Sequence, residues 1–440
     1  MSQTPRSKSW VLAAIVAAVA ILIYAPTWRH GFTCLDDDDL VLDRQAEFGR
    51  GSSLYEVFGQ SYFGGKSTSY YRPVVNLSFA LDAQWSGAEP LGYHLTNTAL
   101  HSIVCVLLFA LLRRLALGDF QALAAALLFA VHPVHVASVA WIPGRNDVLM
   151  TGFALGACLL LIREQDRPGW VNKSLHLLCL VLALLSKETA LCLPILLAVL
   201  LWARGGWREL LSRRRLWLGW AGAFAVYLAA RLLVIAFAYQ DVIDRLALAA
   251  RRWPVPLADL GKLLLPVRLQ VLASPQDVHV WPGVVAMAAL AVVLWRVPAM
   301  RSRRAVFALG CVVVPLLAGL VGAKMVVLEN RLYLAGVGVA ILVGEALGAA
   351  ARKWPRRVRA SGAVVAGVLA LFGIMAVRHS TDYADRLRFA RAAVVASPHS
   401  GIAVNLMRRN ALAGARRFSP PAPRPTRALS PSARPTSTAP

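Results

Sequence analysis

The sequence predicts an all-α polytopic membrane protein, and three observations support this fold class. First, 58% of its 440 residues are hydrophobic and 16% are charged, whereas soluble domains carry about 45–50% apolar and about 25% charged residues. Second, many apolar runs reach the roughly 20 residues that cross a bilayer as a helix. Third, the basic residues behind the net charge of +24 fall in short loops between these runs, as membrane topology requires. Because the positive charge follows the loops, we exclude nucleic acid as a partner.

The apolar runs predict about eleven transmembrane helices. We expect these helices near residues 10–26, 95–117, 120–141, 147–163, 174–187, 189–204, 215–238, 280–297, 305–323, 331–351 and 358–377. The first run ends without a small-residue cleavage site, so we interpret it as an uncleaved helix and not as a signal peptide.

The basic residues also predict the orientation. With the N-terminus in the cytoplasm, every cytoplasmic turn is basic, and the opposite orientation fails at each turn. These turns are RR at 113–114, REQDR, RGGWRELLSRRR, RVPAMRSRR and ARKWPRRVR. The large loop 27–94, the loop 239–279 and the C-terminus are then external, and RRWPVPLADLGKLLLP in the second loop is a re-entrant or interfacial segment. Frequent Arg and Ala favour a bacterial inner membrane with a periplasmic C-terminus; in a eukaryote the membrane is that of the endoplasmic reticulum.

Composition divides the chain into three parts. Residues 1–378 form the membrane domain. Residues 379–417 contain a helical pair, predicted within 382–415. Residues 418–440 are rich in Pro, Ser, Thr and Arg and are expected to be disordered.

Four consecutive carboxylates, Asp36, Asp37, Asp38 and Asp39, follow the first apolar run within GFTCLDDDDLVLD. We call them the acidic stretch. Their simplest interpretation is a solvated loop kept out of lipid. Adjacent carboxylates could also bind a divalent cation such as Mg or Mn. Alternatively, one of them could act as a general base whose pKa is tuned by its neighbours.

Further ionisable and polar residues lie at the ends of the predicted helices or within them. Such groups are costly at membrane depth and indicate function by default. In chain order, the candidates are Arg72, His94, Asn97, His101, His132, His135, Arg145, Asp147, Lys187, Glu188, Glu329, Arg331 and Tyr333. His132 and His135 flank Pro133, which breaks a helix near mid-span; two histidines alone are a weak metal signal.

Spacing and chemistry separate the other candidates. His94, Asn97 and His101 share one helix face and either pack or function together. Lys187 and Glu188 could be a simple local ion pair.

The best phosphate site predicted from physical chemistry is the stretch from Glu329 to Tyr333. Arg331 suits bidentate phosphate recognition. The start of the helix adds amide donors and the positive end of its dipole. The six cysteines show no spacing typical of a metal site or a disulfide framework.

Six stretches occur in a characteristic order: DD after the first run, YRP…LSF, YHLTN…LH, LLFAVHPVHVASVAWIPGRNDVL, SKE and NRLYL. Together they resemble the transmembrane and tetratricopeptide-repeat O-mannosyltransferases and their bacterial relatives, a branch of the GT-C glycosyltransferases. The resemblance covers roughly residues 10–377 and implies a GT-C fold.

The resemblance also implies an activity: transfer of a sugar from a polyprenyl-phosphate donor, on the non-cytoplasmic face, with inversion. It places the catalytic carboxylate at Asp36 or Asp37, with Asp38 next, although Leu35 stands where the family has an aromatic residue. The donor phosphate would need cationic partners, which would be Arg331, Arg72, Arg145 and Lys187. The acceptor would be a protein Ser/Thr or a glycolipid, the surroundings are membrane lipid, and mannose is implied only by eukaryotic relatives.

The C-terminal segment departs from the family, whose members continue into several tetratricopeptide repeats. SPHSGIAVNLMRRNALAGA resembles the first helix pair of one repeat, and then the pattern stops; we expect a truncation or a frame change from about residue 416. The alternatives are a non-catalytic scaffold, a lipid-linked-sugar transporter, or a ligase-type transferase acting on glycolipid. A transporter should carry charges near the midplane, whereas here most lie at the external ends.

Overall fold

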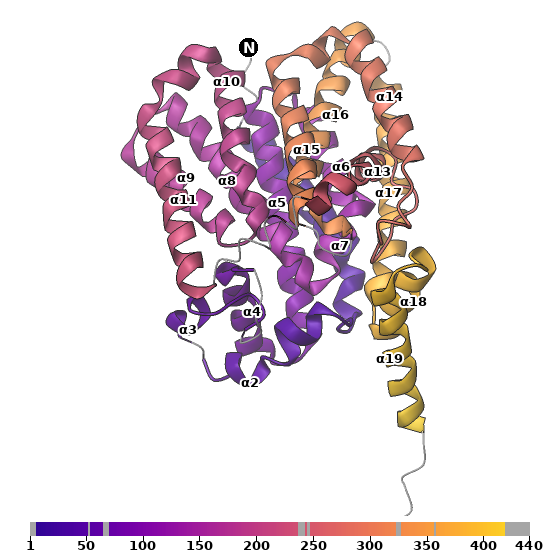
Figure 1. Ribbon diagram of the computed structural model, residues 1–440. Helices are drawn as coiled ribbons and strands as arrows, with labels where there is room; N and C mark the ends of the chain where they lie inside the picture. The colour runs from indigo at the N-terminus through magenta and orange to yellow at the C-terminus, as the bar shows by residue number, and fades with distance from the viewer. Residues whose placement is uncertain are drawn as a thin grey trace, which may run out of the picture.

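The computed structural model describes residues 6–51, 53–64, 70–235, 243, 247–322, 327–355 and 358–418. Helices make up almost all of the regular structure of these residues (Figure 1). The longer helices are α1 (Arg6–Tyr24), α4 (Pro73–Ser86), α5 (Pro90–Arg114), α6 (Asp119–Val131), α8 (Arg145–Asp166), α9 (Trp170–Leu184), α10 (Leu193–Ser212), α11 (Arg214–Val234), α13 (Pro254–Leu264), α14 (Trp281–Arg296), α15 (Arg303–Gly322), α16 (Tyr333–Lys353), α17 (Val358–Ser380), α18 (Arg386–Ala396) and α19 (Gly401–Phe418). The short helices α2 (Gln45–Phe48), α3 (Leu54–Phe58) and α7 (Val136–Val139) lie between them.

The predicted membrane helices are present. In the described part of the chain, eight helices are long and apolar enough to cross a bilayer, and α6 with α7 forms a further span bent by 47°. Two shorter apolar helices, α9 and α14, accompany them. Each of the eleven predicted segments coincides with one of these elements, so the chain is an integral membrane protein. The bend lies at Pro133, which cannot donate an intrahelical hydrogen bond.

Burial separates central helices from lipid-facing ones. The apolar windows of the spans that contain α8 and α16 are 72% and 67% buried, whereas those of α11 and α17 are 17% and 11% buried. The exposed side chains of the outer helices are large and apolar, as a lipid surface requires.

The first long loop and the C-terminal helices lie at the same end of the bundle. Figure 1 places α2, α3 and α4 opposite the end at which the N-terminus lies, with α18 and α19 beside them. We call this the α2–α4 end. The arrangement agrees with the predicted topology, in which both segments lie on the same side of the membrane.

The helical pair predicted within 382–415 is present as α18 and α19. Its assignment to a tetratricopeptide repeat stays a prediction. The segment predicted to be disordered, beyond Phe418, lies outside the described residues.

Candidate active site

The acidic stretch begins in a constrained turn. Leu35 has a φ of 80°, in the left-handed region that residues with a Cβ rarely adopt. The carboxylate of Asp37 is fully buried and accepts hydrogen bonds from the Thr33 amide at 2.6 Å and the Thr33 hydroxyl at 2.5 Å. Burial raises the pKa of Asp37 to about 7, although the two bonds from Thr33 oppose the rise. Asp37 is thus held in place by its own turn.

Asp36 is half-buried and lies near Arg72. Burial raises its pKa to about 6, the Arg72 guanidinium lowers it, and Asp39 raises it again. A carboxylate with such a pKa is mostly ionised at neutral pH and can still accept a proton readily. Asp36 therefore has the properties of a general base.

Arg72 connects the acidic stretch with the turn between α9 and α10. Its Nε and Nη2 donate to one oxygen of Glu188 at 2.9 and 2.7 Å. Its guanidinium also lies 4.7 Å from the ring centres of Tyr62 and Tyr70, within the range of cation–π attraction. Because Pro73 starts α4 directly after Arg72, the helix fixes where this guanidinium lies.

Lys187 connects the same turn with the start of α8. Its ammonium pairs with Asp147 and donates to the Asn146 side chain at 3.0 Å. Burial lowers the pKa of Lys187 to about 8, and Asp147 opposes that shift. The amide of Asn330 donates to the same Asp147 carboxylate at 2.8 Å, so the predicted NRLYL segment lies against this pair.

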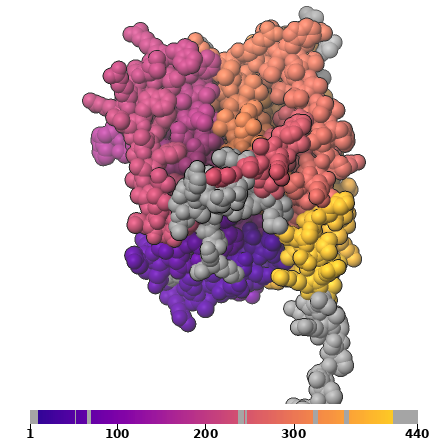
Figure 2. Space-filling view, in the orientation of Figure 1, coloured from indigo at the N-terminus to yellow at the C-terminus, as the bar shows by residue number. Residues whose placement is uncertain are grey.

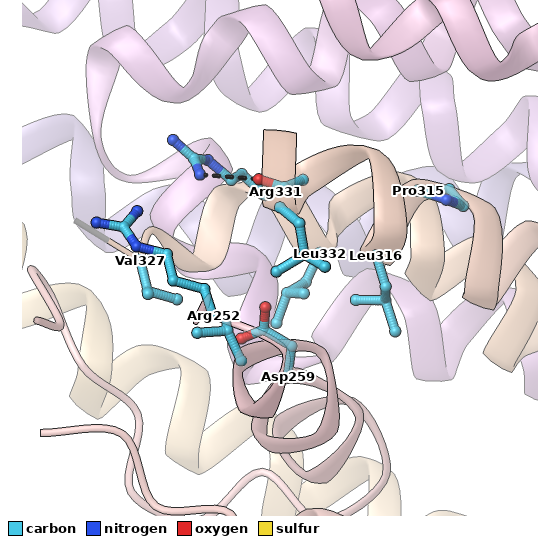
Figure 3. A pocket seen from close by; sticks show the side chains of 10 residues that line it. Arg252, Asp259, Pro315, Leu316, Val327, Arg331 and Leu332 are labelled. Carbon is cyan, nitrogen blue, oxygen red and sulfur yellow. Dashed lines mark hydrogen bonds between the residues drawn. The ribbon is translucent and has the colours of Figure 1, made fainter. Parts of the chain in front are cut away.

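Arg331 lines a partly open cavity that is otherwise largely apolar. Its Nη1 donates to the Gly319 carbonyl at 3.4 Å, and Tyr70, Asp147 and Asp259 act on it electrostatically. In Figure 3, Arg331 and Arg252 lie on one side of the cavity and Pro315 on the other. The lining residues are Arg252, Val255, Asp259, Pro315, Leu316, Gly319, Leu320, Val327, Arg331 and Leu332. We call this the arginine cavity.

Arg145 lies apart from this group because its donors are all engaged by protein atoms. It is fully buried and pairs with Asp82 at 2.5 Å. Nε donates to Asn97 at 2.6 Å, and the two Nη atoms donate to Ser78 and to the Tyr93 carbonyl. The predicted phosphate ligand Arg145 thus holds α4, α5 and α8 together. Gly144, just before α8, lies tightly against α7, because a Cβ there would lie 2.3 Å from the Ala137 carbonyl oxygen.

Three of the predicted histidines form a separate buried cluster with Tyr333. His101 binds the Tyr333 hydroxyl at 2.6 Å and the Ala130 carbonyl at 3.1 Å. His135 contacts the Phe129 carbonyl at 2.8 Å, and His132 contacts that of Leu263 at 3.1 Å. The carbonyls released at the Pro133 break are thereby partly satisfied. This hydrogen bonding fits a packing role.

The two remaining candidates are also outside the central group. The ring of His94 lies 6.0 Å from that of His30. Glu329 accepts from the Gln270 amide at 2.6 Å and pairs with Lys262 at 2.8 Å. Glu329 thus fastens α13, which lines the arginine cavity, to the start of the α16 span.

The divalent-cation site predicted at Asp36 and Asp37 stays a prediction for the described residues. Among them, no group of three or more His, Cys, Asp or Glu side chains is arranged to hold a metal ion. The cation beside Asp36 is the Arg72 guanidinium, and one oxygen of Asp37 is already bound by Thr33. We therefore derive no step through a metal.

Part of the chain is similar in sequence to known proteins. The model of the dolichyl-phosphate-mannose-protein mannosyltransferase family matches residues 74–232. Protein O-mannosyl-transferase Tmtc1 of Drosophila melanogaster is 33% identical over 196 residues, which cover 43% of this chain and 23% of that protein. Protein O-mannosyl-transferase TMTC4 of Homo sapiens is 35% identical over 202 residues, covering 40% and 27%. The predicted resemblance is confirmed. The matched region spans about a quarter of the length of these curated relatives.

The fold has a counterpart among solved structures. The crystal structure of ArnT from Cupriavidus metallidurans in the apo state has a TM-score of 0.50 and 15% identity, covering 92% of this chain and 75% of that one. At that identity the likeness concerns the fold alone, and it confirms the predicted fold class. The mannosyltransferase-like segment 74–232 includes Asp147 and Lys187, while the acidic stretch and Arg331 lie outside it.

Several site residues were not predicted from the sequence. Arg252, Asp259 and Lys262 stand in the stretch interpreted as re-entrant or interfacial. The charges of Asp259 and Lys262 within an apolar helix could have indicated a site. Asp82 is the one charged residue of α4, which was a similar signal. Asn330 lies inside a quoted motif, but nothing local indicates that its partner is Asp147.

Replacing Arg145 by alanine tests its structural role in the mannosyltransferase-like segment. We expect Arg145→Ala to destabilise the protein by about 3–5 kcal/mol, because Asp82 is left buried without its partner. The measurement is the apparent melting temperature in detergent. Arg114→Ala is the control, because its pair with Asp166 is exposed and contributes about 1 kcal/mol or less. Equal melting temperatures for the two variants would contradict this role.

Proposed function

We propose that this protein is a membrane glycosyltransferase that moves a sugar from a polyprenyl-phosphate donor to an acceptor hydroxyl, with inversion. The observation that carries the proposal is a half-buried carboxylate, Asp36, beside Arg72, which in turn interacts electrostatically with Arg331 in the lining of the arginine cavity. The family model describes its members as using dolichyl-phosphate-mannose and a protein. This supports mannose as the sugar and a protein Ser/Thr hydroxyl as the acceptor.

The arginine cavity suits a phosphate attached to an isoprenoid chain. Its apolar wall would contact the isoprenoid chain, and its arginines would face the phosphate. Arginine binds phosphate oxygens through two parallel hydrogen bonds. Arg331 and Arg72 are close enough to interact electrostatically. A phosphate bound by both would therefore lie between the arginine cavity and the acidic stretch. Lys187 adds a third positive charge nearby.

The reaction then needs one general base and positively charged side chains that bind the leaving phosphate. Asp36 takes the proton of the acceptor hydroxyl as its oxygen attacks the anomeric carbon. The bond from that carbon to the phosphate oxygen breaks, and the phosphate leaves with the electron pair. Arg331 and Arg72 stabilise the charge that grows on the phosphate. A single displacement from the opposite face inverts the anomeric carbon.

One carboxylate is enough for this chemistry. Glycoside hydrolysis uses a second carboxyl group to protonate a poor leaving group. A phosphate leaves without such help. Asp37, fixed by Thr33, would instead hold the turn that presents Asp36.

The proposed orientation of the protein in the membrane is inferred from the basic residues of the loops. The N-terminus would be cytoplasmic, and the α2–α4 end, with the site near it, would face the periplasm in a bacterial inner membrane. The acceptor would approach from that side.

Replacing the proposed base tests the function. We expect Asp36→Asn to reduce sugar transfer by about 100-fold or more, because the general base is lost. The measurement uses membranes that contain the full chain and radiolabelled undecaprenyl-phosphate mannose, followed by counting of protein and glycolipid fractions. Glu56→Gln is the control, since Glu56 is an exposed residue of the same loop. Full transfer by Asp36→Asn would refute the assignment, and a silent wild type would favour a scaffold or a transporter.

The pH dependence of transfer tests the environment of Asp36. Its pKa is raised to about 6 by burial, so the carboxylate is ionised above that pH and protonated below it. We expect transfer to fall as the pH drops from 7 through about 6, because Asp36 becomes protonated over this range. A base with an ordinary pKa near 4 would keep its activity at pH 5. A profile that is flat down to pH 5 would contradict the assignment.

A further inference from the structure

The acidic stretch is held from outside by the start of α18. The Gly31 amide donates to the Ala384 carbonyl at 2.8 Å, and the Cys34 thiol donates to the Arg386 carbonyl at 3.8 Å. The Arg386 guanidinium pairs with both oxygens of Asp38, with one N–O distance of 3.2 Å. Residues more than 340 positions apart in the sequence therefore meet beside the candidate base. Figure 2 shows the surface of the C-terminal helices adjoining that of the first loop.

The place of Arg386 is not explained by helix stability. It is the first residue of α18, where a positive charge opposes the helix dipole. Asp385 caps the helix by accepting from the Arg388 amide at 2.8 Å. The Arg386 and Asp38 side chains are 43% and 37% exposed, and such an exposed pair adds little to the stability of the fold. The pair joins the acidic stretch to the start of α18.

Contacts near both ends of α18 hold the helix that carries Arg386 in place. Phe389 is buried, with its ring centre 6.3 Å from that of Trp141 and 5.7 Å from that of Tyr383. Beyond the C-terminal end of the helix, His399 binds Asp277 at 2.6 Å. The helix that carries Arg386 is therefore anchored to the membrane bundle and to the loop before α14.

We propose that Arg386 is a positioning residue for the sugar transfer: by holding Asp38, it fixes the turn that presents Asp36. This inference rests on the proposed function. Leu35, just before Asp36, has a left-handed backbone, which persists only where the surrounding structure holds it. Thr33, a residue of the same turn, binds Asp37, and Arg386, a residue of α18, binds Asp38. The turn is therefore held on both sides. Without Arg386 the turn relaxes, and Asp36 loses its orientation toward the reacting hydroxyl.

The kinetics of an Arg386 variant test this role. We expect Arg386→Gln to lower kcat about tenfold, because small misplacements of a reacting group are costly, and to leave the KM for undecaprenyl-phosphate mannose unchanged. Arg386→Lys should recover part of the loss, as should the charge exchange Asp38→Arg with Arg386→Asp. Arg388→Gln is the matched control, since this neighbour in α18 forms an exposed pair with Asp385 and, within the described part of the chain, no hydrogen bond or ion pair with Asp38. It should behave like the wild type.

A second readout is independent of activity. The Cys34 side chain is 3% exposed and lies under the start of α18, whereas the other cysteines lie in apolar segments. We expect a membrane-impermeant maleimide to label Cys34 several-fold faster in Arg386→Gln than in the wild type or in Arg388→Gln. Unchanged kcat and unchanged labelling in Arg386→Gln would overturn this inference alone. A wild type without transfer would overturn the proposed function instead.

Discussion

The buried ion pair between Arg145 and Asp82 is the interaction on which the site depends. A guanidinium removed from water must be paired and fully hydrogen-bonded, and Arg145 meets this condition with partners on α4 and α5. The pair therefore fastens α4, a helix of the first loop, to the membrane bundle. Arg72 precedes α4 directly, so its position beside Asp36 and Glu188 follows from the same packing.

The same requirement divides these charged residues into two groups. Arg145, Glu329 and Lys262 are bound to protein partners on neighbouring elements, and they hold helices together. Arg331 faces a cavity, and Asp36 is half-buried at the surface of its turn. Groups of the second kind can still bind a phosphate or accept a proton. The acidic stretch shows both kinds within four residues: Asp37 and Asp38 are held by Thr33 and Arg386, while Asp36 faces Arg72.

The sequence was sufficient for the helices and only partly for the site. Apolar runs are a local property, so the eleven segments and the break at Pro133 could be predicted. The meeting of Arg72 with Glu188, 116 residues apart, is a property of helix packing that no local pattern contains. The same holds for Arg145: it was predicted as a phosphate ligand from its place at a helix end, and its engagement by Asp82 appears only in the folded chain. The segment that contains Arg386 was interpreted only from its helical pattern. The contact of Arg386 with Asp38 could therefore not be predicted.

The central claim is that the donor phosphate and Asp36 meet near the α2–α4 end. The most direct test is a cryo-EM structure of the full chain with undecaprenyl phosphate. We predict that the phosphate lies between Arg331 and Arg72, with the isoprenoid chain along the apolar wall of the arginine cavity and Asp36 facing the phosphate. A phosphate bound at the opposite end of the bundle, or bound out of reach of Asp36, would contradict this account.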